Sequence, residues 1–108
     1  MLRIYPVILD WLASLSPVTG AIRLHDANLA DHLRRSSTSV ALNVAEGAGA
    51  VGGDKRRSYR IALREMREAV ACLDIADRLR YVEAATAIET DRQERIVATL
   101  VRLARPGA

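Results

Sequence analysis

The sequence predicts an all-α protein, an antiparallel up-down four-helix bundle that forms a single domain over residues 1–108. Apolar residues recur three or four positions apart through most of the chain, which is the spacing of one helix face. No segment alternates in the manner of a strand. Half of the residues are apolar but only 4% are aromatic, so the core must be aliphatic, as in helices packed on helices. We expect helices at about 3–24, 27–48, 54–82 and 86–104.

The first helix is predicted by one continuous apolar stripe. Its members are Ile4, Ile8, Trp11, Leu15, Val18 and Ile22. Pro17 lies inside the stripe and removes a backbone hydrogen bond, so we expect it to kink the helix. Because the stripe continues across the proline, one bent helix is favoured. The alternative is a break at Ser16, with Ser16 capping a separate second helix.

The second helix begins after Asp26, a residue type that caps helix N-termini well. Its inner stripe consists of Leu29, Leu33, Val40 and Val44. Leu42 and Ala45 lie off that stripe, so the second half of the helix is apolar on more than one side. Such a helix has a second neighbour, either in its own bundle or in another subunit. Gly47 and Gly49 are expected to end it.

Asp54 is the expected cap of the third helix, which we expect to reach Tyr81 or Val82. The inner stripe of this helix contains Tyr59, Leu63, Met66, Val70 and Leu73, flanked by Ala62, Ala69 and Ala76. Thr86 and Glu89 have the spacing of a capping box for the fourth helix. The stripe of that helix is Ile88, Ile96, Leu100 and Leu103, and Pro106 and Gly107 end it.

Positive charge is concentrated in the third helix. The net charge is +3, and the segment from Lys55 to Arg67 holds six basic residues against Glu65 alone. Basic side chains on one helix face can follow a phosphate backbone. The candidate nucleic-acid-binding residues are Lys55, Arg56, Arg57, Arg60, Arg64 and Arg67, joined by Arg34 and Arg35. The alternative is a solvated face neutralised by Glu65, Glu68 and Asp74 on neighbouring turns.

No catalytic, metal or cofactor site is predicted. His25 and His32 are about 10 Å apart along a helix, too far to share one metal. Asn28, His32 and Ser36 step by four, but a helix interior offers no free backbone N–H for an oxyanion hole. Cys72 is the single cysteine and is read as an apolar filler. No disulfide is possible within the chain and no uncharged run is long enough to span a bilayer, so we expect a soluble, cytoplasmic protein without membrane contact.

The segment from His32 to Gly47, HLRRSSTSVALNVAEG, resembles the signature of a bacterial four-helix-bundle family. Members of that family are encoded in intervening sequences of 23S ribosomal RNA genes, among other places. The residues that carry the match and form its structural motif include Ser36, Ser39, Asn43, Glu46 and Gly47, with Glu68 on the third helix. Asn43 and Glu46 either satisfy groups of the helices and fix their register or form a polar site inside the bundle, with Arg34 or Arg35 of a neighbouring subunit as a partner for Glu46.

The resemblance extends to the accessory proteins of diversity-generating retroelements. Those relatives are pentameric barrels with a basic surface that engages nucleic acid and a reverse transcriptase. The resemblance therefore implies a homo-oligomer, a pentamer in the first instance, and association with RNA or DNA and with a reverse transcriptase or another protein. It implies no enzymatic activity.

The third helix departs from the family pattern Ala-x-Gly-Ser-x-x-Glu. Ala62 and Glu68 fit, but Arg64 and Glu65 stand where glycine and serine are expected. A Leu-Gly-Tyr pattern near the helix end reads Leu-Arg-Tyr, with Arg80 in the place of glycine. We interpret Arg64, Glu65 and Arg80 as residues at or near a subunit boundary.

The function predicted from the sequence is that of a non-catalytic, homo-oligomeric accessory protein that binds RNA or DNA weakly through the basic face. The alternative is an oligomeric scaffold or protein-interaction module with no nucleic-acid role.

Overall fold

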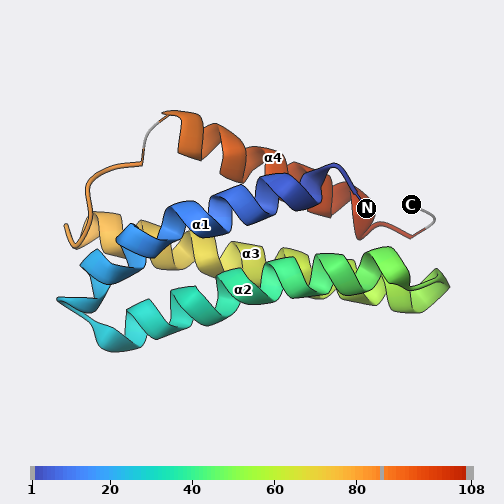
Figure 1. The fold of residues 1–108 in the computed structure, drawn as a ribbon, viewed down its shortest axis with the longest axis horizontal. Helices are drawn as coiled ribbons and strands as arrows, with labels where there is room; N and C mark the ends of the chain where they lie inside the picture. The colour runs from blue at the N-terminus through green and yellow to red at the C-terminus, as the bar shows by residue number, and fades with distance from the viewer. Residues whose placement is uncertain (1, 86, 107–108) are drawn as a thin grey trace.

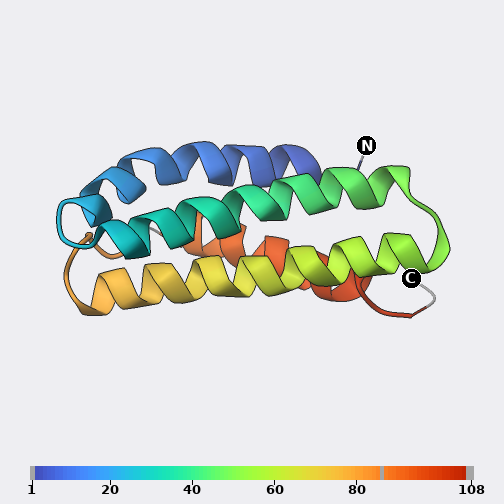
Figure 2. The same ribbon diagram turned by 90° about the horizontal axis from the view of Figure 1, so that it is seen from below.

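The computed structural model describes residues 2–85 and 87–106, and within them every regular element is a helix. The four helices are α1 (Ile4–Arg23), α2 (Ala27–Gly49), α3 (Gly52–Arg78) and α4 (Ala87–Leu103). They run alternately in opposite directions and form an elongated body of 42 × 26 × 19 Å (Figures 1 and 2). The predicted up-down four-helix bundle is confirmed.

Each helix packs on its neighbours in the chain, and α4 closes the bundle by packing on α1. The α2–α3 pairing is the most extensive of these contacts. Figure 2 shows these two helices side by side along their whole length. The surface of this helix pair therefore dominates one side of the molecule.

Helix α1 passes through Pro17 as a single helix, so the expectation of one helix is confirmed and the alternative of a break at Ser16 is wrong. Five of the six predicted stripe residues are buried, and Val18 is half-buried. Near the proline, the Ser14 hydroxyl donates a hydrogen bond to the Trp11 carbonyl over 2.6 Å. Figure 2 shows the second half of the helix curving toward α2, as expected after a proline.

The predicted cap of α2 is confirmed. The backbone N–H of Leu29 donates to Asp26 Oδ1 over 2.9 Å, which satisfies one of the free donors at the start of the helix. The Arg23 guanidinium reaches across the turn to Asp31 at 2.7 Å, where both side chains are exposed. The turn between α1 and α2 is therefore short and polar.

Small side chains fill the contact between α2 and α3. Ser36, Ser37 and Ala41 are buried on α2, and Ala62, Ala69 and Ala76 are completely buried on α3. The two serine hydroxyls donate to carbonyls of their own helix, Ser36 to His32 and Leu33 and Ser37 to Arg34. They need no partner on a neighbouring helix, so the helices approach each other without an unsatisfied polar group at these positions.

Helix α2 ends at Gly49, within one residue of the predicted end and at one of the two glycines expected to end it, while Gly47 lies inside the helix. A Cβ atom at Gly47 would lie 2.6 Å from Cε1 of Tyr59, whose side chain is completely buried. The glycine is thus required by the close approach of an aromatic ring to the α2 backbone. Glycine is therefore needed at residue 47 because of packing against Tyr59, and not because the helix ends there.

Both predicted ends of α3 are wrong. The helix begins at Gly52, two residues before Asp54, after an N-cap at Val51 that makes no side-chain hydrogen bond. It ends at Arg78 rather than at Tyr81 or Val82. After Leu79, Arg80 adopts a left-handed conformation with φ 61°. The N–H of Tyr81 then bonds to the Ala76 carbonyl and that of Arg80 to the Asp77 carbonyl, which is the Schellman arrangement.

The predicted capping box at Thr86 lies outside the described residues, as do the Ile88 side chain and Gly107. Helix α4 begins at Ala87, within one residue of the predicted start, and ends at Leu103. Ile96 and Leu100 are completely buried, as the predicted stripe requires. At one end of the bundle the rings of His25 and Tyr81 stack, with centroids 4.8 Å apart, and join the α1–α2 turn to the segment after α3.

We predict that Gly47→Ala lowers the free energy of unfolding by about 1–3 kcal/mol, because the new methyl group overpacks against the Tyr59 ring. Urea denaturation followed by circular dichroism measures the change. The matched control is Gly20→Ala in α1, where a Cβ would meet nothing within 4 Å and which should stabilise by about 0.5–1 kcal/mol. In a Tyr59→Leu background the cost of Gly47→Ala should largely disappear. An equal cost in both backgrounds would contradict the packing explanation.

We predict that Arg80→Gly raises the free energy of unfolding by about 1 kcal/mol, because glycine adopts a positive φ without the Cβ strain of arginine. Arg80→Ala removes the same charge but keeps the Cβ, so it should bring no comparable gain. Thermal and urea denaturation of the two variants separate the backbone effect from the charge effect. Equal stabilisation by both would assign the effect to the charge.

Candidate nucleic-acid interface

Most of the predicted basic residues project from α3 into solvent. Arg57, Arg60, Arg64 and Arg67 are exposed, while Lys55 and Arg56 are half-buried. The apolar side of the same helix carries Tyr59, Ala62 and Met66, all buried. The structure therefore separates the two faces of α3 as the sequence predicts.

Few carboxylates neutralise this face. Within the described residues, Arg64 is the single member of the predicted set with an ion pair, to Glu65 at 3.7 Å. The Arg64 side chain is still 67% exposed. Glu68, predicted as a neutralising partner, lies instead 3.6 Å from Nε2 of His32 on α2. Asp74 makes no ion pair with a described residue, so the face retains most of its positive charge.

Arg34 and Arg35 are both exposed on α2. The His32–Glu68 contact shows that this turn of α2 lies beside the corresponding turn of α3. The two helices are antiparallel (Figure 2). One turn further along α2 from this contact therefore corresponds to one turn back along α3, and the residues at these places are Arg35 and Arg64. Arg34 is rotated by about 100° around the helix relative to Arg35. Arg35 is therefore better placed than Arg34 to extend the basic face.

Of the two alternatives for Asn43 and Glu46, Asn43 follows the structural one. The Asn43 amide donates to the backbone carbonyl and to the hydroxyl of Ser39, over 2.9 and 3.0 Å. Glu46 is exposed and has no ion pair within the described part of the chain. Asn43 thus takes the structural role that the sequence allowed, inside its own helix, and a polar site within the bundle is not what these residues build.

The serine, histidine and cysteine considered as catalytic or metal-binding candidates are not arranged as a reactive group in the described part of the chain. The Ser36 hydroxyl is buried and directed at backbone carbonyls, and His32 lies beside Glu68. The pKa of the buried Cys72 thiol is raised, first by loss of solvation and second by the Glu68 carboxylate, so the thiolate that would act as a nucleophile is disfavoured. Among the described residues, no three His, Cys, Asp or Glu side chains are placed to hold a metal ion.

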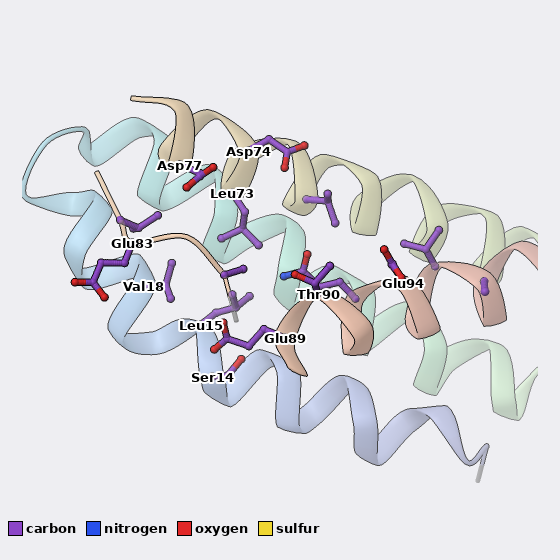
Figure 3. Close-up of a pocket in the computed structure, with 16 residues that line it drawn as sticks. Ser14, Leu15, Val18, Leu73, Asp74, Asp77, Glu83, Glu89, Thr90 and Glu94 are labelled. Carbon is purple, nitrogen blue, oxygen red and sulfur yellow. The ribbon is translucent and has the colours of Figure 1, made fainter. Parts of the chain in front are cut away.

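One feature of the structure is absent from the sequence predictions. A cavity of about 490 Å³ lies between α1, the C-terminal half of α3 and the N-terminal half of α4 (Figure 3). Its walls come from three helices and from the segment before α4. The apolar stripe of each helix can be found from the sequence. The cavity between the three helices depends on the angles at which they pack, and the spacing of apolar residues does not determine those angles. The feature of the sequence that could have indicated this cavity is the series of acidic residues at positions 74, 77, 83, 89 and 94.

Comparison with known proteins identifies the family. The family model for the 23S rRNA-intervening sequence protein matches residues 18–101, which is most of the chain. The chain belongs to this family. The predicted family resemblance is thereby confirmed, and the matched residues include all of α2 and α3.

A solved structure shows the same fold. It is the crystal structure of a protein of unknown function from the S23 ribosomal protein family of Bacteroides thetaiotaomicron. The TM-score is 0.80, and the likeness covers 94% of this chain and 98% of that chain at 18% sequence identity. A comparison with curated proteins finds no match. Within the described residues, no helix has the length and apolar character needed to cross a membrane.

The three residues that depart from the expected family pattern, Arg64, Glu65 and Arg80, lie in different structural environments. Arg80 occupies a backbone position with positive φ, which by itself explains why glycine suits this site. Arg64 and Glu65 are adjacent on α3, where Arg64 is exposed and the Glu65 side chain is only 18% exposed. Arg80 therefore needs no subunit contact to account for the expected glycine, and the placement of Arg64 and Glu65 at a subunit boundary stays a prediction.

We predict that Cys72 makes the stability of the bundle fall at alkaline pH. Its pKa in the folded state lies above the ordinary value of 9.0. Above that value the unfolded chain loses the thiol proton while the folded chain retains it, so the free energy of unfolding decreases as the pH rises. The loss should begin as the pH approaches the ordinary thiol pKa and grow as the pH rises further.

Urea denaturation under reducing conditions, at a series of pH values, measures this dependence. Cys72→Ala removes the thiol and should flatten the curve relative to the native sequence, whatever its effect at neutral pH. A difference between the two proteins that does not change with pH would contradict the prediction.

Proposed function

We propose that the chain is a non-catalytic, homo-oligomeric accessory protein that binds RNA or DNA weakly through the exposed face of α3 and the adjoining Arg35. The observation that carries this proposal is the set of exposed arginines on α3, of which Arg64 alone has an ion pair within the described residues. Such a surface attracts phosphates by releasing their counterions.

The aromatic residues support binding without base recognition. Trp11 and Tyr59 are completely buried, Tyr5 is half-buried, and the half-buried ring of Tyr81 stacks on His25. Stacking on exposed aromatic rings is the usual way in which proteins hold single-stranded bases. A surface of arginines without such rings reads charge and shape, so we expect little dependence on nucleotide sequence.

Exposed apolar side chains support self-association. Leu42 projects from α2 with 64% of its surface exposed, and Ile75 on α3 is 46% exposed. The second neighbour that the sequence predicted for the second half of α2 is therefore not supplied by the chain at Leu42. A second copy would cover it, and the resemblance to retroelement accessory proteins makes a pentamer the assembly to test. A ring of subunits would repeat the basic face around its axis.

The second candidate function is an oligomeric scaffold that binds another protein and no nucleic acid. The same exposed apolar residues favour it, because large exposed side chains on a helix surface are typical of protein contacts. A reverse transcriptase or another protein is a possible partner under either function. Salt dependence separates the two candidates.

We predict that a fluorescent single-stranded RNA of arbitrary sequence binds with an affinity that falls steeply as salt rises from about 50 to 200 mM. The variant Arg56→Ala/Arg57→Ala/Arg60→Ala should lose most of the binding and reduce the slope of log K against log salt by about 2, because each neutralised phosphate contributes about 0.7 on a single strand. Fluorescence anisotropy measures both quantities.

The matched control removes the same charge elsewhere, in Arg95→Ala/Arg102→Ala/Arg105→Ala, and should bind nearly as the native chain does. If both triple variants lose the same affinity for RNA, the binding depends on the net charge of the chain and not on the basic face of α3. Undetectable binding at low salt would favour the scaffold.

We predict an assembly mass that is a multiple of the 11.8 kDa chain, five in the proposed pentamer, by light scattering after gel filtration. Leu42→Asp should lower that mass while leaving the helical circular dichroism unchanged, because the side chain is exposed in the single chain. Thr38→Asp, one turn away and also exposed, is the control for added charge. A monomer at all concentrations would refute self-association without affecting the RNA measurement.

A further inference from the structure

The cavity between α1, α3 and α4 combines an apolar floor with an acidic mouth. Figure 3 shows Leu15, Val18 and Leu73 directed into the space. Val70, Val82 and Val97 complete the apolar lining, and all six side chains are buried or half-buried. At about 490 Å³ the cavity falls within the range of about 300–1,000 Å³ that small-molecule sites occupy.

Carboxylates surround the opening. Asp74 and Asp77 approach from α3, Glu83 from the segment before α4, and Glu94 from α4 (Figure 3). All four are exposed, and none forms an ion pair with a lysine, arginine or histidine of the described chain. Lysine, arginine and histidine contribute nothing to the lining itself.

This arrangement is unusual for a chain with a net charge of +3. The arginines lie on the solvent side of α3, and the cavity collects negative charge without a compensating cation. Several like charges over a low-dielectric wall add their fields and concentrate positive ions at the mouth. Thr90 and Gln93 add hydrogen-bonding groups to the same wall.

We propose that this cavity binds a small organic cation, a molecule with an apolar body and a single ammonium or related positive group. The apolar body lies on Leu15, Val18 and Leu73, and the cation lies at the mouth between Asp77 and Glu94. An organic anion is repelled by the mouth, and a neutral apolar molecule gains only the contacts of the floor. This site is separate from the basic face and does not depend on nucleic-acid binding.

Three probe molecules separate the contribution of the apolar floor to binding from that of the acidic mouth. Octyltrimethylammonium carries both the apolar body and the charge, octanoate carries the same chain length with the opposite charge, and tetramethylammonium carries the charge alone. Titrations followed by two-dimensional ¹H–¹⁵N NMR report where each probe binds. We expect octyltrimethylammonium to shift residues of the cavity wall, with an affinity at least about tenfold above that of the other two and weakened by salt.

The variant Asp77→Asn/Glu94→Gln should weaken octyltrimethylammonium binding by about fivefold or more, the sum expected for two exposed charge pairs. The matched control is Glu46→Gln, an exposed carboxylate on α2 away from the cavity, with no expected effect. Ala98→Phe tests the floor: the residue is exposed at the cavity edge, and a phenyl ring there should obstruct the apolar body while the circular dichroism spectrum stays helical.

Three results would overturn the proposal. Equal binding of octanoate would make the carboxylates irrelevant, and equal binding of tetramethylammonium would make the apolar floor irrelevant. Shifts of the cavity residues on dilution of the protein alone would assign the space to a second copy of the chain. None of these outcomes bears on the RNA titration, so the two proposals succeed or fail separately.

Discussion

The close approach of α2 and α3 is the constraint on which the rest of the structure depends. Small residues are buried on both helices, Ser36 and Ser37 on α2 and three alanines on α3, and Gly47 allows the Tyr59 ring to lie directly on the α2 backbone. The Tyr59 hydroxyl is buried without a hydrogen-bond partner among the described residues, and burial raises its pKa. A buried unsatisfied hydroxyl costs about 1–3 kcal/mol, so the packing of the ring outweighs that cost. The exposed arginines of α3 lie on the outer side of this helix pair, where Glu68 of α3 contacts His32 of α2.

The sequence predicted features that depend on a single helix more reliably than features that depend on its ends or on several helices together. The stripe of α1, the Asp26 cap and the four-helix topology follow from periodicity and local capping, and the structure confirms them. In α3 the flanking alanines are fully buried, whereas Leu63, Val70 and Leu73 of the predicted stripe are half-buried. The end of α3 was missed because Arg80 supports a Schellman ending at a position where glycine would have signalled it. The start of α3 was missed because Asp54 looked like a cap, whereas the chain enters the helix through the positive φ of Gly52.

Candidate binding residues were predictable only as faces. The four-residue steps of arginine along α3 show that these side chains share one side of a helix, and the structure places that side in solvent. The sequence could not show that Glu68 is directed at His32 on α2 rather than at an arginine of its own helix. The acidic cavity is a further case, because its carboxylates are dispersed over residues 74–94 and converge only when α1, α3 and α4 pack together. Convergence of this kind is a property of the bundle and not of any one stripe.

Arg80 shows how the bundle imposes a local conformation that the residue itself disfavours. An L-residue in the left-handed region costs about 1–2 kcal/mol relative to its usual helical conformation. The hydrogen bonds from the Arg80 and Tyr81 N–H groups to α3 carbonyls and the stacking of Tyr81 on His25 offset that cost. These contacts engage the backbone of residues 80 and 81 and the Tyr81 ring, and none of them uses the Arg80 side chain. Glycine, the residue that the family resemblance leads us to expect at position 80, would fit this turn without strain. Arg64 and Glu65 lie in a regular stretch of α3, where the backbone does not call for a small residue. A preference for small residues at those two positions would have to come from something that packs against α3, and in this chain the pair is long and charged.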